Sequence, residues 1–166
     1  MALDELADRL AAGAAGMEGL REGVVAGEPW PLSDAYGAEP ESDWGPKEVL
    51  AHVAEMLSYW LGQVEAILAA PRADGAPGFG RVATDETRIA RIGADRRLPA
   101  GELLDRIGEA ALAVRSRMGA LTPAELERSG VHPRLGEITV PAIFERFVIG
   151  HLEEHVEQLT ELLARG

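Results

Sequence analysis

The chain has 166 residues, of which 46% are hydrophobic and 27% charged, and it contains no cysteine. It carries 16 basic and 28 acidic side chains, and its formal net charge is −12. This composition indicates a single globular domain over residues 1–166, and it excludes disulfides, thiolate metal ligands and a cysteine nucleophile. Because an acidic surface repels phosphate backbones, we do not expect a nucleic-acid partner. No apolar run is long enough for a membrane helix, and Asp4 and Glu5 stand where a signal peptide carries basic residues, so we expect a cytoplasmic protein without a membrane partner.

Four segments show the spacing of apolar residues that is typical of amphipathic helices. The first contains several glycines, which weaken a helix and make it depend on tertiary packing. Each of the other three starts at or just after a proline or threonine, residues that suit the beginning of a helix. The four predicted helices are residues 3–24, 46–70, 100–121 and 139–163.

The sequence predicts an all-α fold, because no segment alternates apolar and polar residues as a half-buried strand does. Four amphipathic helices bury their apolar faces best in a four-helix bundle. About 27 residues, 72–98, join the second and third helices, far more than a tight antiparallel connection needs. This length permits a crossover along the bundle and predicts an up-down-down-up order, in which the second and third helices are parallel. A short helix is expected within the crossover, over residues 86–92.

Three of the four histidines fall on the apolar faces of two predicted helices. His151 and His155 are four residues apart and share a face of the fourth helix, while His52 lies among apolar residues of the second. A buried imidazole must satisfy its ring nitrogens, and one shared metal ion would satisfy a nitrogen of each ring. The alternative is an ordinary core histidine that is hydrogen-bonded to a carbonyl or carboxylate group. We predict a divalent metal site of His52, His151 and His155, and the ligand type is compatible with zinc, nickel or iron.

Several other chemistries lack their sequence motifs. Leu152 follows His151, which excludes the His-Glu-x-x-His motif of metalloproteases. No glutamate stands three residues before a histidine, as the Glu-x-x-His motif of di-iron bundles requires. The chain also lacks the Gly-x-Ser-x-Gly motif of many hydrolases and the glycine patterns of nucleotide-binding loops.

Further candidate residues have two interpretations each. Glu55, three residues after His52, is a candidate catalytic base or a group that orients His52, and its alternative is a solvent-facing helix residue, which we favour slightly. Trp44 either covers the metal end of the bundle or only stabilises the helix start, and Trp60 either lines a pocket or packs in the core. For His132 we expect a solvent-exposed loop histidine, with a position near the site as the alternative.

The crossover carries a group of basic residues that is unusual in this acidic chain. We expect a solvated surface in which these side chains balance nearby acids, because most charge runs lie on the surface. The alternative is recognition of a cosubstrate that carries a carboxylate. The group consists of Arg81, Arg88, Arg91, Arg96 and Arg97.

Two stretches of the chain resemble the DinB-like (YfiT-like) family of metal-dependent enzymes. They are residues 44–55, WGPKEVLAHVAE, and residues 132–141, HPRLGEITVP, which lead into the HLEEH sequence of residues 151–155. The resemblance implies an up-down-down-up bundle in which His52, His151 and His155 hold a divalent metal. It also implies a relation to the N-terminal domains of mycothiol-dependent maleylpyruvate isomerases and to mycothiol or bacillithiol S-transferases. In those relatives the metal activates the thiol of a low-molecular-weight cosubstrate, and homodimers are common in the family.

Two functions follow as expectations. The first is a metal-dependent enzyme that acts on a small-molecule substrate, by thiol transfer or by hydrolysis at the three-histidine site. The second is a non-catalytic bundle that binds a metal or a small ligand in a stress response. An open metal position beside a cleft favours the first, and a closed site with a fourth protein ligand favours the second. We also expect a homodimer formed by helix faces away from the metal, in which the surface left by Gly13, Gly16 and Gly23 meets a partner helix. The alternative is that these glycines only let the first helix pack tightly inside its own bundle.

Overall fold

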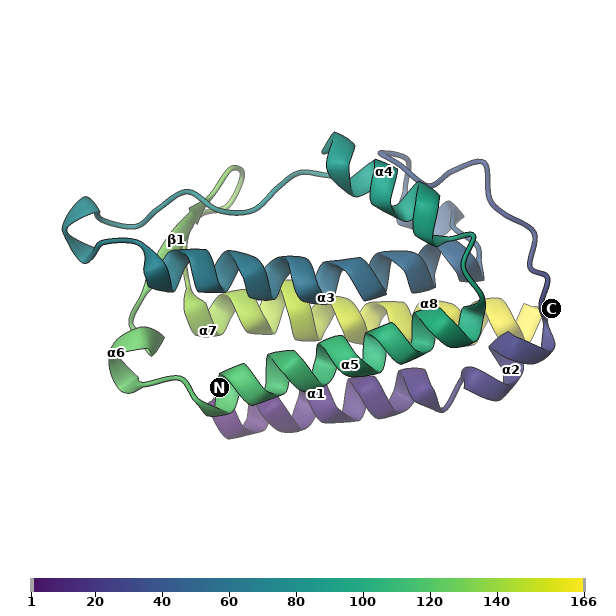
Figure 1. Ribbon diagram of the computed structural model, residues 1–166, viewed down its shortest axis with the longest axis horizontal. Helices are drawn as coiled ribbons and strands as arrows, with labels where there is room; N and C mark the ends of the chain where they lie inside the picture. Colours follow the sequence, from purple (N-terminus) through teal and green to yellow (C-terminus); the bar gives the residue numbers. More distant parts are fainter. Residues whose placement is uncertain (1, 166) are drawn as a thin grey trace.

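Four long helical segments form the body of the protein, which is a four-helix bundle in the computed structural model (Figure 1). The structure describes residues 2–165. In Figure 1, the first and last of these segments run toward one end of the bundle, and the two middle segments run toward the other. The segments are α1 (Leu3–Glu18), α3 (Pro46–Ala69), α5 (Ala100–Gly119) and a C-terminal segment made of α7 (Val140–Ile143), the π-helix η3 (Phe144–Gly150) and α8 (His151–Arg165).

Short elements connect the long helices. The first predicted helix is divided near Gly19 into α1 and α2 (Arg21–Ala26), and the crossover contains α4 (Glu86–Asp95), which confirms the short helix expected there. Helix α4 packs against α3 (Figure 1). No helix among residues 2–165 combines the length and the apolar character that a membrane span requires. The remaining short helices are η1 (Glu41–Asp43), η2 (Arg72–Asp74) and α6 (Pro123–Leu126).

A small β-hairpin precedes the last long helix, and the all-α prediction missed it. Strands β1 (Ser129–His132) and β2 (Gly136–Thr139) are antiparallel, with Ser129 opposite Thr139 and His132 opposite Gly136. Gly136 has a φ of 77°, a backbone conformation that glycine adopts without strain. Strands of four residues are too short to show the apolar alternation on which the prediction relied.

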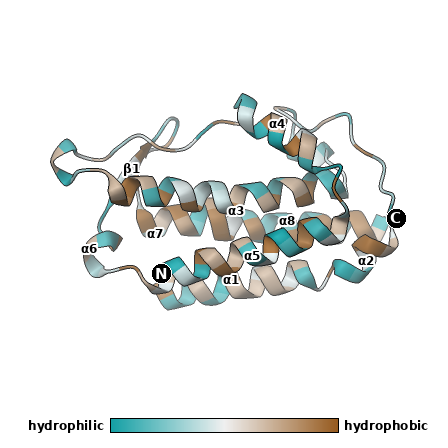
Figure 2. Ribbon diagram, in the orientation of Figure 1, coloured by the Kyte–Doolittle hydropathy of each residue, from teal (hydrophilic) through white to brown (hydrophobic). Residues whose placement is uncertain are grey.

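The core lies along the axis of the bundle, where the apolar faces of all four segments meet. Hydrophobic and hydrophilic residues recur around each long helix, because an amphipathic helix carries them on opposite faces (Figure 2). Leu6 of α1, Val53 of α3, Ile107 of α5 and Phe144 of η3 are each at most 1% exposed. The predicted apolar faces therefore form one continuous core, which fixes the positions of α3 and α8 relative to each other.

Two glycines of α1 lie against α8 of the same bundle. A Cβ atom at Gly13 would lie 3.0 Å from Cδ2 of Leu152, and one at Gly16 would lie 3.2 Å from Cγ1 of Val156. These glycines let α1 approach α8 closely, so the prediction that their surface contacts a partner chain is wrong. The homodimer itself stays a prediction, and its interface would need another face.

A valine at position 13 tests this close approach. We expect Gly13→Val to lower the free energy of unfolding by about 1–3 kcal/mol, because the added methyl groups overpack the contact with Leu152. Gly62→Ala in α3 is the matched control, since nothing lies within 4 Å of its added Cβ. It should stabilise the protein by up to about 1 kcal/mol through helix propensity alone. Urea unfolding measures both, and a Gly13→Val protein as stable as the parent would contradict the packing.

Candidate metal centre

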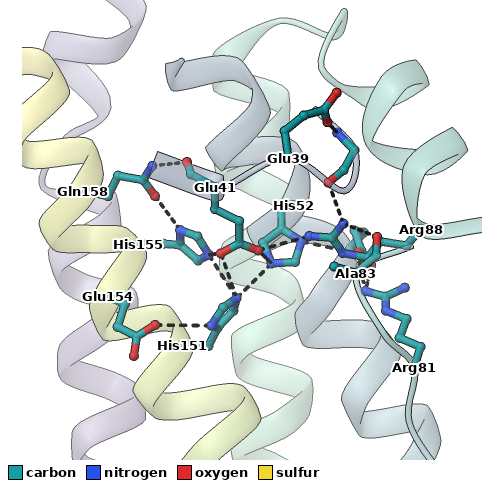
Figure 3. Close-up of polar contacts among 12 residues, drawn as sticks. Glu39, Glu41, His52, Arg81, Ala83, Arg88, His151, Glu154, His155 and Gln158 are labelled. Atoms are coloured by element: carbon teal, nitrogen blue, oxygen red, sulfur yellow. Dashed lines mark hydrogen bonds and ion pairs between the residues drawn. The ribbon is translucent and has the colours of Figure 1, made fainter. Parts of the chain in front are cut away.

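The structure brings the three predicted histidines together inside the bundle. His52 comes from α3, and His151 and His155 come from the first two turns of α8. The Nε2 atom of His151 lies 3.0 Å from Nε2 of His52 and 3.1 Å from Nε2 of His155. Figure 3 shows the three rings pointing toward one common point. The spacing of these residues in the sequence thus corresponds to a real cluster.

A fourth donor, Glu41 of η1, completes the cluster, and the sequence analysis missed it. Its Oε1 lies 3.5 Å from Nε2 of His52, and its Oε2 lies 3.5 Å from Nε2 of His155 and 3.7 Å from Nε2 of His151. The four side chains offer donor atoms that all lie within 4.8 Å of one another. Glu41 has no helical periodicity to mark it, because η1 belongs to an irregular segment. In the sequence, Glu41 is marked only by its position three residues before Trp44.

Each histidine ring has an acceptor near its outer nitrogen, Nδ1, from the residue three positions later in the chain. A hydrogen-bond acceptor there holds the proton on Nδ1 and leaves the Nε2 lone pair free, which is the usual arrangement behind metal-binding histidines. The His155 contact is such a hydrogen bond, whereas the other two are longer polar contacts, and the buried Nδ1 of His52 has no hydrogen-bond partner among residues 2–165. The Nδ1 to oxygen distances are 3.4 Å for His52–Glu55, 3.4 Å for His151–Glu154 and 2.8 Å for His155–Gln158.

The donor set fits a divalent metal ion. Two unprotonated nitrogens 3.0 Å apart repel each other unless a proton or a cation lies between them. Donor atoms that bind one metal at about 2.1 Å are about 3.0 Å apart at right angles and about 3.4 Å apart in a tetrahedron. The separations between the histidine nitrogens are 3.0 and 3.1 Å, and those to the Glu41 oxygens are 3.5 to 3.7 Å. These four side chains therefore form a candidate metal site.

Burial keeps the cluster in the protonation state that a metal requires. His52 and His155 are 3% and 2% exposed, and burial lowers the pKa of both rings, helped by the charges of neighbouring histidines. Burial alone would raise the pKa of Glu41, but a hydrogen bond with His151 and the nearby histidines outweigh it and lower that pKa to about 2. At neutral pH the site thus contains neutral His52 and His155 imidazoles and an ionised carboxylate.

Glu55 lies behind His52 and does not face the solvent. Its side chain is 6% exposed and forms an ion pair with Arg81, so the solvent-facing interpretation is wrong. Burial raises its pKa, while Arg81 opposes that shift. Glu55 approaches Nδ1 of His52 and is absent from the lining of the cavity described next, so its position suits orienting His52 better than acting as a base.

A cavity of about 160 Å³ opens beside the histidines. Trp60 and Phe147 form one wall, with stacked rings whose centroids are 4.5 Å apart. Glu41 and two of the histidines contribute the polar end. The cavity is therefore an apolar recess with the candidate metal site at one end. Its lining residues are Glu41, His52, Trp60, Arg81, Val82, Ala83, Arg88, Phe147 and His151.

Trp44 covers part of the histidine cluster. It is 1% exposed, its ring centroid is 5.2 Å from that of His52, and it stacks on His155 at 6.3 Å. Of the two interpretations of Trp44, the structure supports the one that places it over the metal end of the bundle. Trp44 excludes water from the side of the cluster that it covers. A ligand would therefore reach the histidines from the sides that Trp44 leaves uncovered.

Two of the five crossover arginines, Arg88 and Arg96, are buried, and the side chain of Arg81 is 9% exposed, so the solvated-surface prediction is wrong for these three. Arg88, 5% exposed, donates to Oε1 of Glu41 at 3.0 Å and to the carbonyl oxygens of Gly37 and Ala83. Arg96 donates to the carbonyl oxygen of Ser33, and Arg81 pairs with Glu55. The remaining two, Arg91 and Arg97, are exposed. Composition could not show that the crossover folds back over α3 and buries these charges.

The prediction of a solvent-exposed loop for His132 is also wrong. This residue lies in β1, is 7% exposed and stacks on Phe147 with ring centroids 5.1 Å apart. Its Nδ1 accepts a hydrogen bond from the backbone N–H of Arg134. His132 does not belong to the metal cluster; it supports the aromatic wall of the cavity from behind.

These features define a four-helix bundle with a buried site of three histidines and a glutamate. The chain matches the model of the DinB superfamily over residues 3–159 and belongs to that family. Among solved structures, it is similar to YfiT from Bacillus subtilis, described as a probable metal-dependent hydrolase with an unusual four-helix bundle topology. The TM-score is 0.73 with 18% identity, over 98% of this chain and 86% of that one, so this likeness concerns the fold. No curated protein matches the chain significantly.

The pH dependence of stability tests the burial of these rings. We expect the metal-free protein to lose stability as the pH falls below about 6.5, because the unfolded chain then binds protons that folded His52 and His155 do not. The loss is about 1.4 kcal/mol per pH unit for each such proton. Glu41, with its lowered pKa, adds a loss only below about pH 4.5.

Denaturant unfolding at about pH 7 and about pH 5.5 measures this effect. His155→Leu removes one of the two groups and should reduce the pH dependence by roughly half. Equal stability of the parent protein at the two pH values would show that these imidazoles are not buried in the neutral form.

Proposed function

We propose that the Nε2 atoms of His52, His151 and His155 bind one divalent metal ion and that the protein is a metal-dependent enzyme acting on a small molecule. The observation that carries this proposal is the convergence of three Nε2 atoms beside a cavity, with an acceptor near each Nδ1. Membership of the DinB superfamily and the described role of YfiT, with its similar fold, support it. The up-down-down-up order belongs to the same proposal, since antiparallel α3 and α8 place His52 opposite His151.

Hydrolysis is the reaction that this site supports best. A divalent metal here would lower the pKa of a water molecule or a thiol in the cavity and polarise a substrate oxygen. The cavity volume of about 160 Å³ leaves room for one ring-sized group, which suits attack by water better than a reaction between two organic molecules. Thiol transfer, with a low-molecular-weight thiol as cosubstrate, is the alternative reaction of the same centre.

Glu41 would orient the attacking water by accepting a hydrogen bond. A carboxylate with a pKa of about 2 holds a proton poorly at neutral pH, so it suits orientation better than storage of the proton. Arg88 pairs with its Oε1, and Gln158 donates to its backbone carbonyl oxygen at 2.6 Å. These two contacts fix the side chain and the backbone of Glu41, and they keep its carboxylate beside the histidines.

Glu41 also favours a second candidate function, a non-catalytic metal-binding bundle. A tetrahedral metal held by three histidines and Glu41 has no position left for a substrate. A six-coordinate metal with the same four ligands keeps two positions open toward the cavity. The two functions therefore differ in whether a substrate reaches the metal.

Metal analysis of the purified protein tests the centre. We expect one divalent ion per chain, and its loss in His52→Gln and in His151→Gln, because each variant removes a nitrogen ligand. Glu41→Gln should weaken metal binding by about tenfold or more if its carboxylate is a ligand or holds the ligands in place. His132→Phe is the matched control, since it keeps a flat ring against Phe147 and leaves the cluster intact.

The same samples show what the metal does for the fold. A chelator should lower the melting temperature by several degrees and leave the helical circular dichroism unchanged, because the apolar core does not depend on the site. Linkage predicts about 2.7 kcal/mol of stabilisation at a free metal concentration 100 times the dissociation constant. A parent protein that binds no metal, or a His151→Gln variant that binds it fully, would overturn the proposed centre.

Two assays on the metal-loaded protein separate the functions. Hydrolysis of 4-nitrophenyl acetate should exceed that of the chelated protein by about 100-fold or more, should be lost in His151→Gln and should persist in His132→Phe. Conjugation of a small thiol to an electrophilic bimane dye is the parallel assay for thiol transfer. Acceleration of conjugation alone would favour transfer, and no metal-dependent rate in either assay would favour the non-catalytic bundle.

A further inference from the structure

The charges that line the cavity cancel within the protein. Arg81 is paired with Glu55, and Arg88 is paired with Glu41. Because these pairs cancel, a divalent ion at the proposed centre would make this recess positive. The whole chain has a formal net charge of −12. A positive recess in so acidic a protein selects an anionic ligand and disfavours a cationic one.

Arg81 presents fixed hydrogen-bond donors at this cavity. Its guanidinium carbon lies 3.8 Å from the centroid of the Tyr59 ring, and its Nη2 donates to both carboxylate oxygens of Glu55. No residue among those described, 2–165, accepts a hydrogen bond from its Nε or Nη1. The side chain is 9% exposed and contributes to the cavity lining. A guanidinium that is held on two sides and has unused donor nitrogens can give a charge-assisted hydrogen bond to an anion.

The other wall of the cavity is flat and apolar. Trp60 and Phe147 stack with an angle of 18° between their ring planes, and Val82 and Ala83 add aliphatic surface. The volume of about 160 Å³ is close to that of engineered protein cavities, about 150 Å³, that bind benzene. One aromatic ring therefore matches both the size and the surface of this recess.

We propose that the cavity binds a small aromatic carboxylate, with its carboxylate at Arg81 and its ring against Trp60 and Phe147. This inference rests on the proposed function, because it names the class of substrate that the metal centre receives. A carboxylate accepts a charge-assisted hydrogen bond from a guanidinium nitrogen such as Nη1 of Arg81. Arg81 then acts as a binding residue, and Glu55 holds it in place.

Four probes of the metal-loaded protein separate charge from shape. Phenylacetate carries both the ring and the anion, acetate the anion alone, benzyl alcohol the ring alone, and benzylamine the ring with a positive charge. In isothermal titration calorimetry we expect phenylacetate to bind at least about tenfold more tightly than any of the other three. Benzyl alcohol or benzylamine binding as tightly as phenylacetate would overturn the proposal.

Variants of the crossover arginines locate the anion. Arg81→Gln should weaken phenylacetate binding by about tenfold or more, the loss expected when hydrogen bonds to a charged group disappear, and should leave benzyl alcohol binding unchanged. Arg91→Gln is the matched control, because Arg91 is exposed and absent from the cavity lining. If the two variants lost phenylacetate affinity equally, the effect would be one of long-range charge, and the assignment of the carboxylate to Arg81 would be overturned.

A further variant covers the case in which Arg81→Gln does not fold. Arg81→Lys keeps a positive charge beside Glu55 but lacks the fixed planar geometry of the guanidinium group, so it should fold and still bind phenylacetate several-fold more weakly. Unchanged binding in a folded Arg81→Lys protein would contradict the proposed contact.

Metal content, measured in every sample, separates this inference from the proposed function. A protein that binds one metal but shows no preference for phenylacetate overturns the inference and leaves the metal centre standing. A protein that binds no metal overturns the proposed function. The probes are then applied to the metal-free protein, where the inference stands only if Arg81→Gln still weakens phenylacetate binding.

Discussion

Three imidazole rings share the interior of a small bundle, and much of the surrounding structure serves to satisfy them. Their Nε2 atoms lie as close as 3.0 Å, a separation that is unfavourable for unprotonated nitrogens in the absence of a cation. Protonation would relieve the repulsion, but burial lowers the pKa of His52 and His155 and opposes it. A divalent ion at the proposed centre would satisfy all three Nε2 atoms at once, and the hydrogen bond at Nδ1 of His155 leaves the Nε2 lone pair of that ring free for it.

The irregular segment before α3 depends on buried ion pairs and hydrogen bonds from other elements. Lys47 pairs with Glu28, Arg96 donates to the carbonyl oxygen of Ser33, and Arg88 donates to that of Gly37. These contacts hold the chain that places Glu41 over the histidines. The crossover that carries α4 is thus more than a connection, because its arginines fix the fourth donor of the site.

The charges around the cavity are arranged in pairs, each of one arginine and one glutamate. Glu55 neutralises Arg81 while leaving two of its nitrogens without an acceptor among residues 2–165, and Glu41 neutralises Arg88 while facing the histidines. Each carboxylate therefore orients one arginine, and Glu55 lies near His52 while Glu41 lies near all three histidines. Pairs of this kind limit the cost of burying charge, which isolated arginines next to an apolar wall would incur in full.

The sequence by itself determined the four long helices, the family and the three histidines, because helical periodicity and i, i+4 spacing are local properties. It could not determine Glu41, the burial of Arg81 and Arg88, or the stacking of His132 on Phe147. Each of these depends on how an irregular segment or a short strand folds back onto a distant helix. Such contacts join residues far apart in the chain, and their geometry is set by tertiary packing, which no local pattern encodes.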